Sequence, residues 1–465
     1  MNHSAGTVLS FAMAVSLLLG AVFVAYVAVL VTPLLRSRPR PPGDAAALDW
    51  HVLVPCRDEE AVIGQTLARL RGLHPALHVW VIDDASVDGT ARVISEAAAT
   101  DPYVHLVQRV LPQARTGKGA ALNAAYRALC AWLPEDVAPE RVIVGVFDAD
   151  GTPGPGCLGI ISADHLFGDP GIAAVQIEVR MANRDERRPL PHPYLVRNLL
   201  ARTLVRMQDL EFRTAIPAVQ LSRRMTRTVA MGGNGQFTRL SALQGIALQE
   251  ATTTGEGGGP WGGSLLEDYE LGLQLTLAGW RTAFTRDTWV DQEGLWNVRQ
   301  LLAQRARWSQ GAMQCMRYLP RIWDSRKLTT MGVLEITYCL LQPWLQLFGS
   351  VVFPALAVLL AVRFVRHPEA LGAFLSSGGG YGLLLAYLVL SVIQFTIWGP
   401  LYWLKCERAA GLWRCLGWGV AYSCYIWLYC LCTWRAAGRF VKGRNGWVKT
   451  RRNAELRSAQ ASVQA

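Results

Sequence analysis

The sequence HVWVIDDASVDGT, residues 78–90, decides the fold class. It starts with β-branched and aromatic residues and ends in a turn rich in Asp and Ser, which is typical of a strand that leaves a sheet at a polar edge. Apolar runs of the same kind precede and follow it, and segments with helical spacing separate them. The strand runs are 51–55, 78–84, 104–110 and 141–147, and the helical segments are 56–73, 91–99 and 119–133. This alternation predicts an α/β fold, with a mostly parallel sheet and helices on both faces.

Acidic residues follow two of the predicted strands, at the edge where open α/β sheets bind ligands. Asp83 and Asp84 can accept hydrogen bonds from a uracil or a ribose, although an Asx turn also satisfies the sequence DASVDG. Asp148 and Asp150 place two carboxylates at one strand end. Such a pair can hold Mg²⁺ or Mn²⁺ on a diphosphate, and in isolation it can equally serve turn chemistry.

A basic residue lies at the start of the helix predicted over 119–133. Lys118 stands between two glycines in RTGKGAALN, residues 115–123, where helix N–H groups and the ammonium suit an anionic phosphate. The spacing of a nucleotide-binding P-loop is absent. The histidines show no paired-ligand spacing, so we do not expect zinc.

The sequence LLEDYELG, residues 265–272, opens a predicted helix over 269–278 that ends at Gly279. Asp268 lies at the helix start, where the dipole favours an ionised carboxylate. It can therefore take a proton from an acceptor hydroxyl, with Glu267 as the competing candidate. The plain alternative is that these two carboxylates only stabilise the helix dipole.

A second helix is predicted around QRARWSQG, residues 304–311. Gln304, Arg307 and Trp308 are spaced i, i+3 and i+4 and share one face, whereas Arg305 is expected to point elsewhere. Arg307 can stabilise a phosphate charge and Trp308 can stack on a sugar ring. The alternative is that this face is simply packed.

Between these motifs the sequence is less informative. Residues 190–222 are expected to be helical, with arginines that line a groove or form a solvated face. Residues 231–243 place a glycine-rich turn before a helix, and residues 251–264 read as a loop.

The composition indicates a membrane protein. The chain has 465 residues and a net charge of +11, with 51% hydrophobic but only 17% charged residues. No Lys/Arg stripe interleaved with aromatic residues appears, which argues against nucleic acid as a partner. The ten cysteines form no metal-ligand pattern and are expected to be buried or lipid-facing thiols.

Long apolar segments predict several membrane spans. Residues 8–35 are long enough to cross a bilayer, and the arginines that follow place the next segment in the cytoplasm. A signal peptide is disfavoured because no basic region precedes the apolar run. The expected organisation is an N-terminal transmembrane helix (1–40), a cytoplasmic catalytic domain (48–312), an interfacial helix (313–330), C-terminal transmembrane helices (331–435) and a basic tail (436–465).

This organisation contains a conflict about the tail. Three C-terminal spans, at 331–362, 382–404 and 412–434, put the tail outside, whereas its basic residues favour the inside. Either 331–362 holds an extra crossing or re-entrant hairpin, or the charge rule fails at this end.

Five motifs in one order, VIDDASVDGT, GKGAALN, FDADG, LLEDYELG and QRARW, resemble the processive family-2 glycosyltransferases. These are the membrane synthases of cellulose, chitin, hyaluronan and poly-N-acetylglucosamine, and the resemblance covers residues 50–320. It implies a GT-A-type, Rossmann-like mixed sheet. Leu266 departs from the pattern, since the family usually has Thr there. The implied roles are nucleotide binding for Asp83, Asp84 and Lys118, metal and diphosphate binding for Asp148 and Asp150, general base for Asp268, and acceptor and diphosphate binding for Gln304, Arg307 and Trp308.

The resemblance implies an inverting glycosyltransferase that elongates and translocates a β-linked polysaccharide from a UDP-hexose or UDP-N-acetylhexosamine. The expected cofactor is Mg²⁺ or Mn²⁺. The expected partners are a nucleotide sugar, a glycan acceptor, the lipid bilayer of the inner membrane and an accessory export subunit. Two alternatives stay open: a non-processive enzyme that glycosylates a lipid, and an inactive scaffold, which the intact carboxylates oppose.

Overall fold

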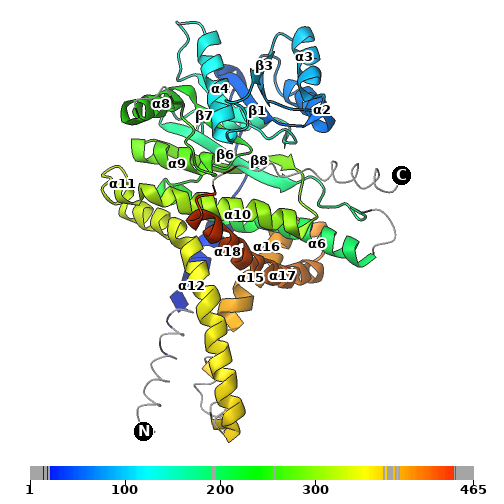
Figure 1. Cartoon of the computed structure of the whole chain (residues 1–465), viewed down its shortest axis with the longest axis vertical. Coiled ribbons are helices and arrows are strands. Elements are labelled where there is room, and N and C mark those ends of the chain that lie inside the picture. The colour runs from blue at the N-terminus through cyan, green and yellow to red at the C-terminus, as the bar shows by residue number, and fades with distance from the viewer. Residues whose placement is uncertain are drawn as a thin grey trace.

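The computed structural model describes residues 14, 18, 21–22, 24–190, 195–254, 258–369, 372–373, 381–382, 385, 388–444 and 446. In this part of the chain, an eight-stranded sheet has the order β3-β2-β1-β4-β7-β6-β8-β5 (Figure 1). The strands are β1 (Asp49–Cys56), β2 (His78–Asp84), β3 (Val104–Arg109), β4 (Val142–Val146), β5 (Thr152–Pro153), β6 (Ile172–Met181), β7 (Gln236–Arg239) and β8 (Arg281–Gln292).

The first half of the sheet is parallel, as the alternation of strands and helices predicts. Strand β1 pairs in parallel with both β2 and β4, and β2 pairs in parallel with β3. The second half is mixed, because β7 runs antiparallel between β4 and β6 while β6 and β8 are parallel. An antiparallel β7 brings the loop before it to the edge where the parallel strands end.

Helices cover both faces of the sheet. Along β1, Val52 and Val54 belong to one apolar cluster and Leu53 to the other, as the two-residue period of a strand requires. The first cluster is covered by α2 (Glu60–Arg71), α3 (Thr90–Thr100) and α5 (Cys157–Ile161). The second is covered by α4 (Lys118–Trp132), α8 (Leu240–Thr254) and α9 (Glu267–Ala278). Helix α9 ends at Gly279, whose φ of 95° is left-handed, so the predicted stop is confirmed.

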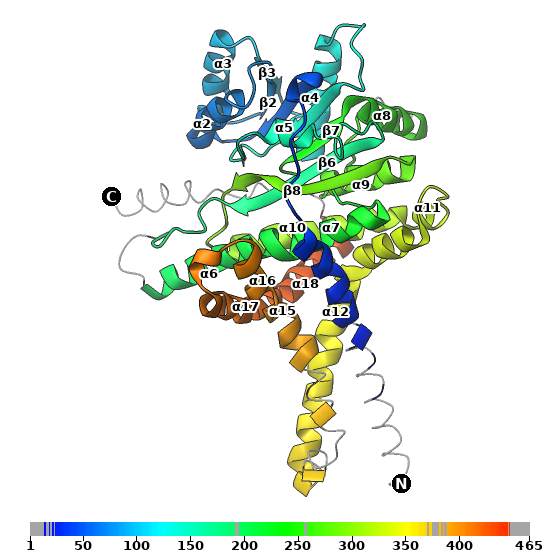
Figure 2. The same ribbon diagram turned by 180° about the vertical axis from the view of Figure 1, so that it is seen from behind.

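A layer of helices lies below the sheet in Figures 1 and 2. It begins with α6 (Leu195–Leu210), a π-helical turn η2 (Glu211–Ala215) and α7 (Ile216–Thr226). It continues with α10 (Val298–Cys315), where the side chain of Asn297 caps the helix by accepting a hydrogen bond from the backbone N–H of Arg299. The helices that follow are η3 (Met316–Tyr318), α11 (Leu319–Trp323), α12 (Thr330–Arg366), η4 (Val389–Ile393), α15 (Gln394–Thr396), α16 (Trp398–Lys405), η5 (Arg408–Ala410), α17 (Leu412–Ile426) and α18 (Leu428–Val441).

Helix α12 extends away from the rest of the molecule, whereas α17 and α18 lie across its base beneath α10 (Figures 1 and 2). The N-terminal apolar helix, described over Val24–Arg36, approaches α12, and the ring centroids of Tyr26 and Tyr338 lie 6.0 Å apart. Within the described residues, one helix, Leu412–Val441, is long and apolar enough to cross a membrane. The expectation of several spans is therefore not confirmed.

Candidate active site

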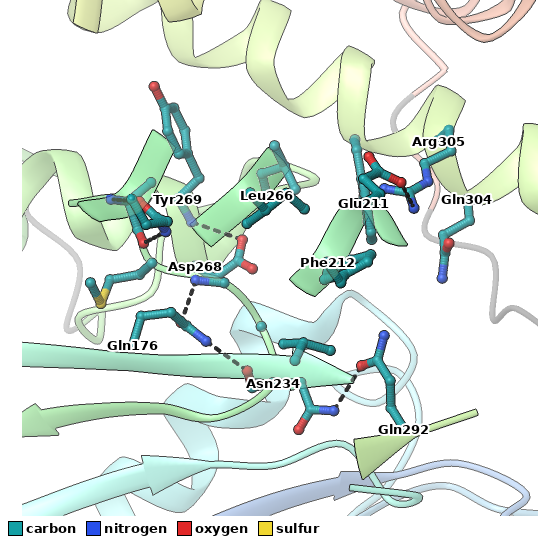
Figure 3. Close-up of a pocket in the computed structure, with 18 of the residues that line it drawn as sticks. Gln176, Glu211, Phe212, Asn234, Leu266, Asp268, Tyr269, Gln292, Gln304 and Arg305 are labelled. Atoms are coloured by element: carbon teal, nitrogen blue, oxygen red, sulfur yellow. Dashed lines mark hydrogen bonds and ion pairs between the residues drawn. The ribbon is translucent and has the colours of Figure 1, made fainter. Parts of the chain in front are cut away.

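The carboxyl ends of the parallel strands open into a cavity of about 800 Å³ that collects the predicted motifs. Nine of the ten predicted site residues line it: Asp84, Lys118, Asp148, Asp150, Glu267, Asp268, Gln304, Arg307 and Trp308. Figure 3 shows Asp268 on α9 above the loop that holds Asn234, with Gln304 and Arg305 on the far side. Residues separated by more than 200 positions in the chain thus form one site.

Asp83 and Asp84 end β2 and are both buried. Oδ1 of Asp83 accepts a hydrogen bond from the backbone N–H of Ser86 at 3.1 Å, which is the turn that the sequence DASVDG also allows. Asp84 receives the guanidinium of Arg109 and, at 3.0 Å, the backbone N–H of Arg115. Asp84 therefore lines the cavity while it holds the loop that leads to Lys118.

Lys118 bridges the two halves of the site. Its ammonium donates to Oδ1 of Asp148 at 2.6 Å and to the carbonyl oxygen of Gly233 at 2.7 Å. Although burial works against the charged form, the carboxylates of Asp148 and Glu267 raise the pKa of Lys118 above its usual value. A fully charged lysine is thus held at the start of α4, where an anionic phosphate would also be favoured.

The loop at 231–235, part of the predicted glycine-rich turn, makes contacts that the sequence did not predict. The side-chain oxygen of Asn234 accepts from the backbone N–H of Asp148 at 3.2 Å, and its amide donates to Gln292 at 2.9 Å. A Cβ added at Gly233 would meet the Lys118 ammonium at 2.9 Å and the Asp268 carboxylate at 3.0 Å. The glycine therefore allows the backbone to pass between the lysine and the acid.

Asp148 and Asp150 suit a divalent cation whose remaining ligands come from the phosphate oxygens of a substrate. Asp148 and Asp150 line the same cavity, and Oδ2 of Asp150 accepts from the backbone N–H of Glu293 at 3.0 Å. Among the described residues, no group of three or more Asp, Glu, His or Cys side chains could hold a metal ion unaided. Mg²⁺ commonly binds through one or two carboxylates with phosphate oxygens as further ligands, so this pair meets that requirement.

Glu267 and Asp268 form a buried carboxylate pair in the first turn of α9. Burial and the neighbouring Asp268 raise the pKa of Glu267 to about 7. Burial likewise raises the pKa of Asp268, while Lys118 and the backbone N–H of Tyr269 at 2.8 Å act in the opposite direction. The sequence predicted that the helix start would favour the ionised form, but desolvation is the larger effect here.

Helix α10 places Gln304, Arg307 and Trp308 along the cavity, as their spacing predicts. The expectation that Arg305 points elsewhere is wrong, because Arg305 lines the same cavity and its guanidinium carbon lies 4.1 Å from the ring centroid of Trp308. Glu211, from the π-helical turn η2, pairs with Arg305 at 2.8 Å. This counter-ion comes from a distant helix, so helical spacing alone did not reveal it.

The far end of the cavity is lined mostly by apolar side chains. Its walls come from the N-terminal helix, from η2 and α7, and from the C-terminal helices. The apolar lining includes Val27, Leu30, Phe212, Ala215, Ile216, Val219, Phe395, Trp398 and Ile426. One cavity therefore joins a charged end beneath the sheet to an apolar end among the helices that approach α12.

The profile described as "Glycosyltransferase like family 2" matches residues 49–311 of the chain, which is more than half of it. The chain belongs to this family. It is a glycosyltransferase with a GT-A-like fold, and the matched residues include all eight strands of the mixed sheet.

Curated relatives carry names that point to lipids. A beta-monoglucosyldiacylglycerol synthase from Trichormus variabilis is 29% identical over 327 residues, 69% of this chain and 60% of the relative. A protein of the same name from Synechocystis sp. is 27% identical over 446 residues, covering 90% of this chain and 78% of the relative. The glycosyltransferase thus spans about 60% of the length of the first of these relatives.

One solved structure resembles nearly the whole chain. It is a mannosyltransferase from Pyrobaculum calidifontis in complex with GDP-Man and Mn²⁺, with a TM-score of 0.51 and 17% identity, covering 95% of this chain and 99% of the other. This likeness supports the fold. The comparisons do not support the expectation of processive polysaccharide synthesis, and the lipid-directed alternative fits them better.

Proposed function

We propose that this glycosyltransferase transfers a single sugar from a nucleoside diphosphate sugar to a hydroxyl group of a membrane lipid, with inversion at the anomeric carbon. The observation that carries the proposal is the continuous cavity with a charged end and an apolar end. A nucleotide sugar requires the charged end, and the hydrocarbon part of a lipid requires the apolar end. The names of the relatives, glucosyldiacylglycerol synthases, agree with this division.

The charges at the apolar end favour an acceptor with an uncharged head. Two arginines line this end, and each is already held by a carboxylate. Arg223 lies 2.5 Å from Glu335, and Arg305 lies 2.8 Å from Glu211. Since a buried arginine with its own counter-ion has little to offer a phosphate, a neutral hydroxyl lipid of the diacylglycerol class suits this end better.

The residues have distinct tasks in the proposed reaction. Lys118 lies at the start of α4, where it can bind the diphosphate, and Asp84 supports the loop that carries it. A divalent cation held by Asp148 and Asp150 would supply positive charge that stabilises the nucleoside diphosphate as it leaves. Asp268 removes the proton from the acceptor hydroxyl. The hydroxyl oxygen then forms a bond to the anomeric carbon as the bond to the diphosphate breaks on the opposite face.

The test uses the purified full chain in nanodiscs with a panel of nucleotide sugars. Acceptors are diacylglycerol, a polyprenyl phosphate and an oligosaccharide primer, each tested separately. We expect one glycolipid that carries one sugar, formed on diacylglycerol. A ladder of saccharide products would instead restore the processive alternative, and loss of donor hydrolysis as well as transfer would favour an inactive scaffold.

A matched pair of variants tests the role of the apolar end. Val219→Glu places a charge in the wall of the cavity, whereas Leu248→Glu places the same charge on α8, where Leu248 is 68% exposed. We expect Val219→Glu to lose transfer to the lipid while donor binding is kept, and Leu248→Glu to behave as the wild type. Equal transfer by both variants would show that the lipid does not enter this end.

A further inference from the structure

The helix over Leu412–Val441 carries one continuous exposed stripe. Its exposed positions recur alternately four and three residues apart, so they lie on a single face along the whole length of the helix. Every residue on this stripe is apolar or glycine. The stripe consists of Trp413, Gly417, Val420, Cys424, Trp427, Leu431, Trp434, Gly438 and Val441.

The opposite face is bound to polar groups of the catalytic domain. In the middle of the helix, the Tyr425 hydroxyl donates to Glu211 at 3.0 Å. At its end, Arg439 donates to Gln310 at 2.9 Å, and the Gln310 amide donates to the carbonyl oxygen of Arg444 at 2.9 Å. These contacts hold the middle of the helix against η2 and its end against α10.

A transmembrane orientation is incompatible with these contacts. A helix of 30 residues is ~45 Å long, so an orientation across the bilayer would carry Arg439 far from the side where the helix starts. Because Gln310 of α10 is bonded to Arg439, α10 would then also have to cross the bilayer. However, α10 presents Gln304 and Arg307 to the charged cavity. In both views α12 points away from the catalytic domain, while α17 and α18 lie across its base (Figures 1 and 2).

The surroundings of the stripe match a lipid surface. Its three tryptophans are about half exposed or more, at 81% for Trp413, 49% for Trp427 and 52% for Trp434. Exposed basic residues flank the stripe at Arg408, Arg414, Arg435, Lys442 and Arg444. Tryptophans prefer the headgroup region of a bilayer, and basic side chains are attracted to anionic lipids.

We propose that the helix Leu412–Val441 lies in the plane of an anionic membrane surface, with its stripe inserted among the headgroups, and does not cross the bilayer. Tyr422, Ile426 and Tyr429 of the same helix line the cavity, so the cavity wall and the membrane surface share one element. The residues after Val441 then stay on the side of the catalytic domain. This removes the conflict between three C-terminal spans and a basic tail.

The chain offers a convenient probe of this arrangement. Of its ten cysteines, all within the described residues, Cys424 is the only exposed one, and it lies on the stripe. A Cβ added at Gly417 or Gly438 meets no atom within 4 Å, so cysteine is accommodated at both positions. A spin label can therefore be placed on Cys424 in the native chain, or moved to Gly417→Cys or Gly438→Cys in a Cys424→Ala background.

The experiment measures the depth of each label in nanodiscs of phosphatidylcholine and phosphatidylglycerol, from its collisions with oxygen and with a water-soluble nickel complex. Cys424→Ala alone, which should take up no label, is the control. We expect the same shallow depth at all three positions, roughly 5–10 Å below the surface. Depths that place positions 417 and 438 on opposite sides of the bilayer centre would overturn the proposal. So would labels fully exposed to water, or coupling between labels of two copies of the chain.

Discussion

The ammonium nitrogen of Lys118 lies 2.6 Å from Oδ1 of Asp148, so the cation at the start of α4 and the first acid after β4 are bound to each other. The same ammonium reaches the carbonyl oxygen of Gly233 at 2.7 Å. The lysine thereby fixes the position of two loops that both border the donor end of the cavity. In the proposed reaction, a nucleotide sugar would bind at a site whose charged side chains are already held in place.

Lys118→Met should weaken donor binding. The variant keeps most of the side-chain volume but removes a hydrogen-bonded charge, worth about 1.5–3 kcal/mol, so the Kd for the nucleotide sugar should rise roughly 10–100-fold. Isothermal titration calorimetry measures this change. Lys327→Met is the matched control, because Lys327 contacts the carbonyl oxygen of Ala278 and does not line the cavity. An unchanged affinity of Lys118→Met for the nucleotide sugar would show that Lys118 does not bind the donor.

Asp150→Asn should abolish sugar transfer without unfolding the protein, because one of two carboxylates suited to a divalent cation is lost. Transfer assays with Mg²⁺ or Mn²⁺, and with EDTA, test this directly, and circular dichroism checks the fold. Full activity of the wild type in excess EDTA would show that turnover needs no such cation.

The parallel half of the fold could be predicted from sequence because its signals are local. Strands β1 to β4 are apolar runs, and helices with clear spacing separate them. The mixed half could not be predicted, because β7 is only four residues long and its partners in β4 and β6 are distant in the chain. The pairing of Val175 with Phe237 depends on long-range contacts that no local pattern records.

In the site, too, local features could be predicted from the sequence, whereas features that depend on long-range contacts could not. The spacing of Gln304, Arg307 and Trp308 predicted a shared cavity face, since one helix fixes it. The place of Arg305 could not be predicted, because the Glu211 carboxylate that holds it comes from η2. Burial of Asp268 was missed for a similar reason, since desolvation depends on what the tertiary fold packs around a helix start.

A stack of neutral histidines should make stability depend on pH. His51, His78 and His105 lie side by side on β1, β2 and β3, and the rings of His51 and His78 stack at 4.9 Å. Burial and the neighbouring rings lower the pKa of His51 to about 3 and that of His78 to about 4, from a usual value near 6.5. Below pH 6.5 the unfolded chain therefore binds more protons than the folded protein. The stability that these histidines contribute is fully present above pH 6.5 and is lost progressively as the pH falls towards their folded-state pKa values.

The free energy of unfolding measured by urea titration at several pH values tests this dependence. One buried histidine contributes at most about 1.4 kcal/mol per pH unit to the slope, so His51→Gln should flatten the curve below pH 6.5. His367→Gln, which replaces an exposed ring, should leave it unchanged. Equal slopes in the wild type and His51→Gln would mean that the stack does not control acid stability.

The last prediction assigns the general base. Asp268→Asn keeps the shape of the side chain but removes its basicity, so sugar transfer should fall about 10²–10⁴-fold while donor binding survives. Because burial raises the pKa of Asp268, kcat/KM of the wild type should rise with pH over a range higher than that of an ordinary aspartate. A base must be deprotonated to act, so activity is lost on the acid side.

Glu267→Gln separates the two carboxylates. It removes a neighbouring negative charge, which should lower the pKa of Asp268 and move the acid limb of the pH profile to lower pH, while transfer at neutral pH continues. Nucleotide affinity and transfer rate are measured for both variants under the same conditions. If Asp268→Asn transfers sugar at the wild-type rate and Glu267→Gln is inactive, Glu267 is the base. In that case the first residue of α9, one step or about 100° around the helix from Asp268, faces the acceptor hydroxyl.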